Sequence, residues 1–318
     1  MVEVLVVVAI IGTLIALLLP AVQAVRAAAQ RAQCAGNLRQ IALAANTYHA
    51  AQGSYPPGLN QFRFSAAPQF RGTSLFVFLL PHLEQGTLLQ GWDFADPMNN
   101  TRGGVAAPAA AVLGVLLCPA DRIAENPAAK AGRYSGLTSY GGNGGSRSYS
   151  PDIASVDGIF HTTGPGSLPQ PNQRPISQKM IRDGTSTTLL FGERSHYDPN
   201  YESFAYASWT DSLQSLGSWA AIGGRKRIGD VTLSGFAPIN YRLPFHYDNR
   251  AAADPPLGGS LDFAYYEDLR VCAWGSNHPG GANFAMADGS LRFIAEDLPL
   301  ATLRALGTRE GEEVVGDF

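Results

Sequence analysis

Two side chains near the C-terminal end have the types that acid–base catalysis uses. His278 and Asp288 lie in the stretch HPGGANFAMADG, and Ser276 and Ser290 flank them. An imidazole, a carboxylate and a hydroxyl can act together as general base, orienting group and nucleophile. The sequence contains neither the G-x-S-x-G turn of hydrolases nor an H-E-x-x-H metal helix. We therefore expect no enzyme and interpret His278 as a loop residue bonded to a hairpin backbone, with catalysis by His278 and Asp288 as the less favoured alternative.

Four acidic residues within a short stretch are weak candidates for binding calcium. Ca²⁺ takes several oxygen ligands from carboxylates and carbonyls. The candidates are Asp254, Asp262, Glu267 and Asp268. Acidic loop residues are more often simply solvated, so calcium is a minor alternative, and no other cofactor is expected.

The three cysteines, Cys34, Cys118 and Cys272, lie far apart in the chain. They form no C-x-x-C pair and stand near no histidine at zinc spacing, so a zinc site of that kind is disfavoured. Outside the cytoplasm one disulfide is permitted, and one thiol is then left over. Cys34 and Cys118 are candidates for a bond that joins an N-terminal helix to the rest of the chain. Other pairings and free thiols stay open.

The composition is that of a turn-rich protein with few charges. Of 318 residues, 45% are hydrophobic and 15% are charged, and there are 35 glycines and 21 prolines. This apolar content is enough for a sizeable core, while glycine and proline favour turns over a helical bundle. The net charge is −3, and the short basic run Arg225-Lys226-Arg227 is interpreted as a solvated turn. Because no basic stripe is present, we expect no nucleic-acid partner.

The first fifty residues predict one long helix with two different halves. Residues 4–25 contain no charge, and about 22 helical residues span ~33 Å, enough to cross a bilayer. Residues 26–52 are rich in good helix formers and carry an apolar stripe at helical spacing. The stripe consists of Leu38, Ile41, Ala45 and Tyr48. We therefore divide the chain into a transmembrane half, 1–25, an amphipathic half, 26–52, and a globular domain, 53–318.

A cleaved signal peptide is the alternative for the apolar segment. Such a peptide has a basic start, a short apolar core and a small-residue cleavage site. Residues 21–29 are rich in small residues, but the basic start is absent and the helical pattern continues without a break. We favour an uncleaved helix, which Pro20 is expected to kink.

Beyond the helix, the sequence predicts an α+β fold in which the long helix packs on an antiparallel β-sheet head. The clearest signal is a hairpin, with strands at 282–287 and 290–295 around Asp288-Gly289, whose turn residues are expected at positive φ. Residues 187–192 predict a short strand and residues 112–118 a buried one. Residues 74–90 predict a helix interrupted at Pro81.

Three other stretches give weaker signals. The glycine-rich residues 139–146 are typical of a turn and match no nucleotide-binding loop. Residues 223–256 are interpreted as a long insertion. The aromatic run at 196–219 is expected to serve core and loop packing, with a carbohydrate platform as the alternative.

Residues 2–12, VEVLVVVAIIG, resemble the prepilin N-terminal motif of type IV pilins and type II secretion pseudopilins. In that family a short basic leader and G-F-T-L-V-E begin the hydrophobic helix. A prepilin peptidase cleaves after the glycine and methylates the new N terminus. The resemblance implies that Glu3 matches the glutamate that pairs with a neighbouring subunit's N-terminal amine. The alternative is a head-group carboxylate favoured by the helix dipole.

The leader, the cleavage glycine and the phenylalanine of that motif are missing, and Met1 stands where the family has leucine. A leucine codon can serve as a bacterial start and be written as methionine. We therefore hypothesise that the start lies upstream of Met1. In-frame upstream codons without a basic stretch ending in G-F-T would contradict this hypothesis.

The C-terminal pattern of His278, nine residues, then Asp288-Gly289 is similar to the H-x9-D-G signature of a large bacterial family. Members of that family have prepilin-type N termini and a domain of unassigned activity. Further matching islands lie at 33–41, 56–58, 80–85, 117–121, 139–140, 183–186 and 192–193. The resemblance implies location and architecture, and no reaction.

The expected function is structural: a membrane-anchored, pilin-like subunit or accessory of a type IV pilus or a type II secretion-like filament. We expect a single span in the bacterial inner membrane, with the domain in the periplasm or at the cell surface. The expected partners are membrane lipid, like or related pilin subunits and, if the true N terminus lies upstream, prepilin peptidase. Small residues at Ala9, Gly12 and Ala16 permit close helix approach. An anchored binding module for calcium or a glycan is the alternative.

Overall fold

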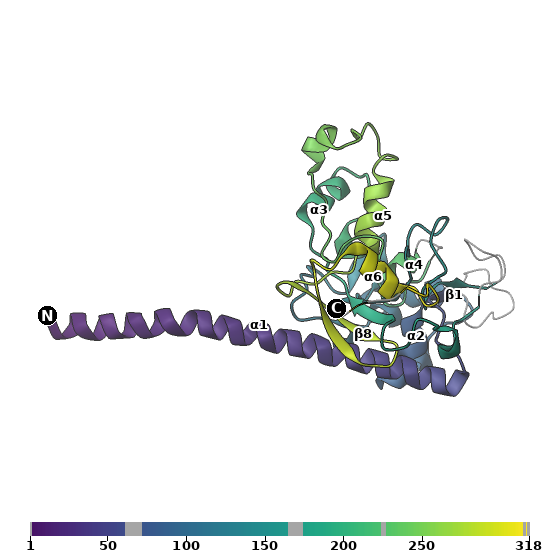
Figure 1. The fold of residues 1–318 in the computed structure, drawn as a ribbon, viewed down its shortest axis with the longest axis horizontal. Helices are drawn as coiled ribbons and strands as arrows, with labels where there is room; N and C mark the ends of the chain where they lie inside the picture. Colours follow the sequence, from purple (N-terminus) through teal and green to yellow (C-terminus); the bar gives the residue numbers. More distant parts are fainter. Residues whose placement is uncertain (1, 61–71, 165–173, 224–226, 314–315, 317–318) are drawn as a thin grey trace.

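The computed structural model describes residues 2–60, 72–164, 174–223, 227–313 and 316. Helix α1, Val2–Gln52, is one continuous rod that projects from a head formed by the rest of the chain (Figure 1). At 1.5 Å per residue it is about 77 Å long. Pro20 lies inside the helix, which runs on without a sharp bend (Figure 1), so the expected kink is absent.

The two predicted halves of α1 differ in their surroundings. Side chains before Arg26 are exposed, whereas seven residues from Cys34 to Ala45 are buried against the head. The apolar part reaches a mean hydropathy of 2.9 over 18 residues, none of it buried, and is long enough to cross a membrane. A signal sequence near an N terminus would also meet that criterion.

The head is built on a five-stranded mixed sheet of order β7-β4-β6-β8-β9. Neighbouring strands are antiparallel except for β4 and β7, which run parallel. The packed half of α1 covers one face of β6, β8 and β9, and α6 covers the other face. The α+β prediction is confirmed. The strands are β4 (Tyr140–Asn143), β6 (Leu189–Glu193), β7 (Thr232–Leu233), β8 (Gly281–Met286) and β9 (Leu291–Ala295), and α6 is Leu300–Gly307.

Short elements complete the head. In the part of the chain that the structure describes, two small sheets pair β1 (Leu59–Asn60) with β5 (Thr162–Thr163) and β2 (Ala128–Lys130) with β3 (Arg133–Ser135). The other α-helices are α2 (Leu75–Leu79), α3 (Pro199–Tyr206), α4 (Ile228–Val231) and α5 (Ala264–Cys272). The 3₁₀ turns are η2 (Leu80–Leu83), η3 (Gly86–Gly91), η4 (Pro97–Thr101), η5 (Gly104–Ala106), η6 (Pro108–Ala110), η7 (Gly114–Leu116), η8 (Gln178–Met180), η9 (Leu213–Ser215) and η11 (Tyr247–Ala252).

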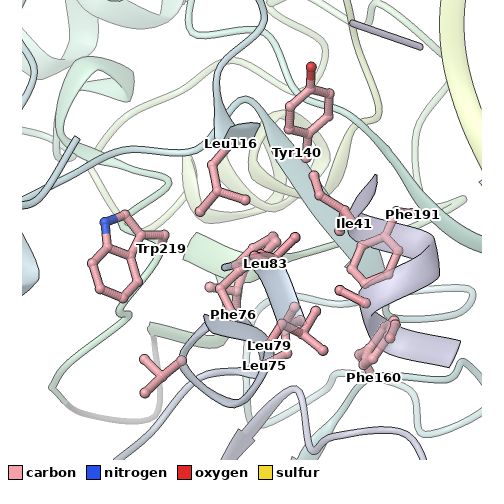
Figure 2. Close-up of a cluster of buried hydrophobic side chains, with 14 of the residues drawn as sticks. Ile41, Leu75, Phe76, Leu79, Leu83, Leu116, Tyr140, Phe160, Phe191 and Trp219 are labelled. Atoms are coloured by element: carbon pink, nitrogen blue, oxygen red, sulfur yellow. The ribbon is translucent and has the colours of Figure 1, made fainter. Parts of the chain in front are cut away.

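The main core lies between α1 and the sheet. Figure 2 shows Ile41 of α1 among side chains from α2, β4 and β6, including Phe76, Tyr140 and Phe191. A second core, under α6, contains Trp274 and Phe284. A third core holds together the lobe formed by α3, α5 and η11, which stands away from α1 in Figure 1.

The glycine-rich turn predicted at 139–146 is only partly confirmed: residues 145–146 form a turn in which Gly145 has a φ of 90°, but Gly141 and Gly142 lie inside strand β4 in the sheet. A Cβ on Gly142 would come within 2.5 Å of the Phe160 ring, and one on Gly141 within 2.7 Å of Leu233. Glycine is present here because neighbouring layers approach the strand closely, which is a tertiary requirement that turn propensity cannot detect.

The strand predicted at 112–118 is also wrong, since this segment contains turn η7. The Asn37 side chain of α1 donates to the Leu117 carbonyl at 2.9 Å, and the Ser139 amide donates to the Leu116 carbonyl at 2.8 Å. The first bond holds the segment against α1, and the second holds it to the residue before β4. Its apolar run reflects burial beneath the helix and not pairing in the sheet.

Other predictions are confirmed or adjusted. The strand at 187–192 is β6, and the helix around Pro81 divides into α2, η2 and η3. The hairpin is β8–β9, but its loop consists of the four residues 287–290, of which only Gly289 takes positive φ, at 87°. Residues 223–256 contain α4, β7 and η11, so they are not simply an insertion. Of the basic run 225–227, Arg225 and Lys226 lie outside the described residues, as does Met1.

Candidate functional site

A disulfide joins the long helix to the head. Cys34, on the packed half of α1, is bonded to Cys118, which follows turn η7, across a sequence separation of 84. Both residues are buried. This is the pair that the sequence offered as a link between helix and domain, and it leaves Cys272 as a buried free thiol.

A glutamate and a histidine lie directly against this disulfide. Glu193 is the last residue of β6, and His278 stands in the loop before β8. His278 Nε2 is 3.3 Å from Glu193 Oε1 and 3.4 Å from Cys118 Sγ. The side chains of Glu193 and His278 are 1% and 2% exposed, so a carboxylate and an imidazole share a site that excludes water.

Further hydrogen bonds hold the Glu193 side chain and the His278 backbone. Asn283 of β8 donates its backbone amide to Glu193 Oε2 at 2.7 Å and its side-chain amide to Oε1 at 3.1 Å. The backbone amide of His278 donates to Ser276 Oγ at 3.1 Å. A buried carboxylate needs such partners, because desolvation without them is costly. Cys34, Cys118, Glu193 and His278 are called the junction cluster below; the disulfide fixes its cysteines, and Asn283 fixes the Glu193 carboxylate.

A second buried polar cluster uses the same two chain segments. Asp121 follows Cys118 by three residues, and His196 follows Glu193 by three. Asp121 Oδ2 accepts from His196 Nδ1 at 2.7 Å and from the Ser139 hydroxyl at 2.8 Å. Burial raises the pKa of Asp121, but the adjacent His196 and the hydrogen bonds outweigh it and hold that pKa below its ordinary value.

This second cluster is not arranged for nucleophilic catalysis. His196 Nε2 lies 3.1 Å from the Leu216 carbonyl, which can only accept a hydrogen bond. Ser139 donates to the Asp121 carboxylate and not to the imidazole. A catalytic serine would instead need an imidazole nitrogen free to take its proton. The cluster links four chain segments and has a structural geometry.

The residues of the predicted acid–base pair do not meet. His278 is buried before β8, whereas Asp288 is exposed in the loop after β8, so the six-residue strand, roughly 20 Å long, separates them. Asp288 Oδ1 accepts from the Ser290 amide at 2.8 Å, and its own amide donates to Thr185. The alternative of catalysis by His278 and Asp288 together therefore fails on geometry.

The calcium candidates are used in separate contacts. Asp268 is paired with Arg147, and Glu267 accepts from Thr210. Asp262 accepts from two backbone amides of its own turn, and the Asp254 carbonyl accepts from Tyr266. Among the described residues, the group whose ligand atoms could hold a metal is instead the junction cluster.

The aromatic run at 196–219 builds internal structure. Phe204 stacks on Phe263 with ring centroids 4.2 Å apart, and Trp209 packs edge-on against Tyr247. The guanidinium of Arg250 lies over both the Trp209 and the Tyr247 rings. These rings form the third core, as the packing interpretation predicts. Glu3, the predicted assembly residue, is exposed in the first turn of α1.

Sequence reasoning missed Glu193, Asp121 and His196 as members of polar clusters. Glu193 and Asp121 lie in two of the matching islands, at 192–193 and 117–121. The family resemblance therefore included both residues but assigned neither of them a role. Their convergence depends on the pairing of β6 with β8 and on the position of η7 beneath α1. No local spacing encodes that arrangement.

Comparison with known proteins gives one match. The family model described as "Protein of unknown function (DUF1559)" matches residues 23–300, which is most of the chain. No curated protein and no solved structure matches. The matched range begins within α1 and includes both polar clusters and the β8–β9 hairpin. This protein belongs to the family described as Protein of unknown function (DUF1559).

Proposed function

We propose that this protein is a pilin-like structural protein, anchored in the bacterial inner membrane by the first half of α1 and bearing its head outside the cytoplasm. In this role it is a subunit or accessory of a type IV pilus or a type II secretion-like filament. The observation that carries the proposal is the apolar half of α1. It extends clear of the head and exposes aliphatic side chains on every face of the helix.

Water is a poor environment for this surface. The large aliphatic residues between Val2 and Val25 are 50–74% exposed. Burying one such side chain fully gains roughly 1.5–3 kcal/mol. An amphipathic helix could bury one stripe against the head, but a helix that is apolar all round needs lipid or other apolar helices. This is the expected chemistry of an anchor that also packs in a filament.

The anchor offers a surface for helix packing. Ala9, Gly12 and Ala16 recur at helical spacing, and a Cβ added at Gly12 would meet no atom within 4 Å. Small residues permit the close approach of neighbouring apolar helices. Glu3 lies six residues, or between one and two turns, before Ala9, where a carboxylate in an apolar setting needs a cationic partner. The N-terminal amine of an adjacent subunit would supply that charge.

Membrane fractionation tests the anchor. We expect the full chain to remain in the membrane fraction after alkaline carbonate extraction, with its N-terminal segment uncleaved. Replacing Ile11 and Ile15 by arginine should release it, since each central arginine costs about 2.5–3.5 kcal/mol in a span. The matched control places one arginine at Leu261, which is 89% exposed on the head, and should stay membrane-bound.

Two outcomes would contradict the anchor: a wild-type chain that is freely soluble, or one cut between residues 21 and 29.

Assembly is tested separately by cross-linking in cells. We expect Glu3→Ala to lose cross-linked oligomers while it keeps membrane attachment. Oligomers that are unchanged by Glu3→Ala would remove the filament part of the proposal and leave the anchor.

A further inference from the structure

We propose that the junction cluster is a zinc site when its disulfide is reduced, with Cys34, Cys118, Glu193 and His278 as the four ligands. Zinc and the disulfide would then be alternative links between α1 and the head. The inference concerns the buried junction alone and does not depend on the membrane anchor or on filament assembly.

The donor set is complete for a closed zinc site. Two thiolates, one imidazole nitrogen and one carboxylate oxygen are ligand types that Zn²⁺ accepts in tetrahedral geometry. The four candidate ligand atoms all lie within 4.8 Å of one another, and all four residues are buried. Four protein ligands leave no position for water, so the site would be structural and not catalytic.

The distances within the cluster fit such a tetrahedron. Zinc bonds of about 2.0–2.3 Å place the ligand atoms of a tetrahedron roughly 3.3–3.8 Å apart. His278 Nε2 is 3.3 Å from Glu193 Oε1 and 3.4 Å from Cys118 Sγ, so two edges already have this length. The sulfur–sulfur edge would open once the covalent bond is broken.

The surroundings orient the ligands as metal sites require. Ligating carboxylates are normally fixed by outer hydrogen bonds. Asn283 donates to both oxygens of Glu193 and turns Oε1 toward His278. A disulfide by itself needs only two cysteines. It gives no reason to desolvate an imidazole and a carboxylate against its sulfurs, a cost that a cation would offset.

The conversion balances with a dithiol reductant. The dithiol passes two electrons and two protons to the disulfide, which yields two cysteine thiols and a disulfide in the reductant. Zn²⁺ then displaces the two thiol protons and binds two thiolates, the Glu193 carboxylate and the neutral His278 imidazole. One metal ion would thus hold α1 to three head segments, those of Cys118, β6 and the loop before β8.

Zinc titration of the full chain in detergent tests the site. The chain is reduced with a water-soluble phosphine under nitrogen, loaded with Zn²⁺, desalted and analysed for bound metal. We expect one zinc per reduced chain and none per oxidised chain. Co²⁺ in place of Zn²⁺ should give thiolate charge-transfer absorption and the intense visible bands of tetrahedral cobalt. The melting temperature of the reduced chain should rise when Zn²⁺ is added.

Variants separate this site from binding to thiols alone. His278→Ala and Glu193→Gln should each weaken zinc binding at least tenfold, and Cys34→Ser should abolish it. Cys272→Ser, which removes the buried thiol outside the cluster, is the matched control and should bind like the wild type. Folding of each variant that keeps both junction cysteines is checked in the oxidised state, where the disulfide still holds the helix.

The proposal is overturned if the reduced chain binds no stoichiometric zinc, or if oxidised and reduced chains bind it equally. It is also overturned if His278→Ala and Glu193→Gln bind zinc as tightly as the wild type. That last result would show binding by the cysteines without the geometry proposed here.

Discussion

The two halves of α1 have the same secondary structure and opposite relations to the rest of the chain. In the first half, aliphatic residues surround the helix and none is buried by the head. In the second half, alanine replaces most of the bulky residues, and the buried side chains include Cys34 and the polar Asn37. Asn37 reaches the head through a hydrogen bond to the Leu117 carbonyl.

The difference teaches that helix propensity and docking are separate properties of this sequence. The second half is rich in good helix formers, whereas the first is rich in β-branched Val and Ile, whose helix suits an apolar setting where backbone groups must bond internally. Only the second half combines alanines that let the sheet approach with a polar side chain, Asn37, that bonds to the head. If this comparison holds, changes in the second half will affect head stability, and changes in the first half will affect membrane attachment.

The largest effect is expected from the disulfide. In an oxidising buffer without added metal, replacing Cys34 and Cys118 by serine should lower the free energy of unfolding of the head by about 4 kcal/mol. The separation of 84 residues makes the closed loop long, and its closure restricts the unfolded chain. Denaturant unfolding followed by fluorescence of the buried Trp219 and Trp274 measures the loss.

Cys272→Ser is the control for that experiment, because it removes a cysteine that forms no disulfide. Carbonate extraction should find the double variant still in the membrane fraction. Release of the variant from the membrane would contradict the separation of the two halves.

A matched pair of leucines gives the next effect. Leu38 is fully buried in the main core, while Leu18 is 60% exposed on the apolar half. Leu38→Ala should cost about 3.5 kcal/mol of head stability, from lost burial and the cavity left behind. Leu18→Ala should change it by less than about 0.5 kcal/mol. Equal effects on head stability would show that the exposed half also packs on the head.

Lowering the pH should destabilise the head through protonation of the His161 side chain. His161 lies beside the segment that follows α1, where its backbone carbonyl accepts hydrogen bonds from the Gly58 and Leu59 amides. Burial lowers the pKa of His161 from 6.5 to about 4. Between pH 4 and pH 6.5, His161 is protonated in the unfolded chain but not in the folded one, so the free energy of unfolding rises with pH. This contribution to the free energy of unfolding, about 3 kcal/mol, is fully present above pH 6.5 and is lost as the pH falls to 4.

Parallel unfolding of the wild type and His161→Gln measures this effect, since the difference between their pH profiles isolates one histidine. The variant should show a flatter profile between pH 6.5 and 4. Helicity of the exposed half, followed by circular dichroism in detergent, should not change over this range. Superimposable profiles would exclude His161 as the source.

The fold could be predicted where one local pattern decided the outcome. The pattern of the first fifty residues predicted α1 as one long helix. Alternating apolar and polar residues around a D-G turn predicted the β8–β9 hairpin. Prediction failed at Gly141 and Gly142, where layer packing outweighs turn propensity. It also failed at 112–118, where the side chain of Asn37 takes the carbonyls that a strand would pair.

The candidate site was predictable only in part. Cys34 and Cys118 could be proposed as a pair because Cys34 stood on the predicted amphipathic helix and Cys118 at the end of the strand predicted at 112–118. Glu193 and His278 are 85 residues apart in the numbering and meet through the antiparallel pairing of β6 with β8. The motif itself misled, because it joined His278 to Asp288 by proximity in sequence, whereas an extended strand carries the two apart.

The smallest effect should mark the boundary between the two halves. Ala27 and Gln30 are the first half-buried residues of α1, and the Arg31 guanidinium lies 3.5 Å from the centroid of the Phe293 ring on β9. An exposed cation–π contact is worth about 0.5–1 kcal/mol. Arg31→Gln should therefore cost the head less than about 1 kcal/mol, and Arg26→Gln, on the exposed side of the boundary, should cost nothing measurable.

A double-mutant cycle with Phe293→Leu distinguishes the contact from a general loss of charge. Coupling near zero between Arg31 and Phe293 would mean that this contact does not contribute to docking. The first attachments of α1 to the head would then be the hydrogen bond from the Gln30 side chain to the Pro119 carbonyl and the disulfide at Cys34.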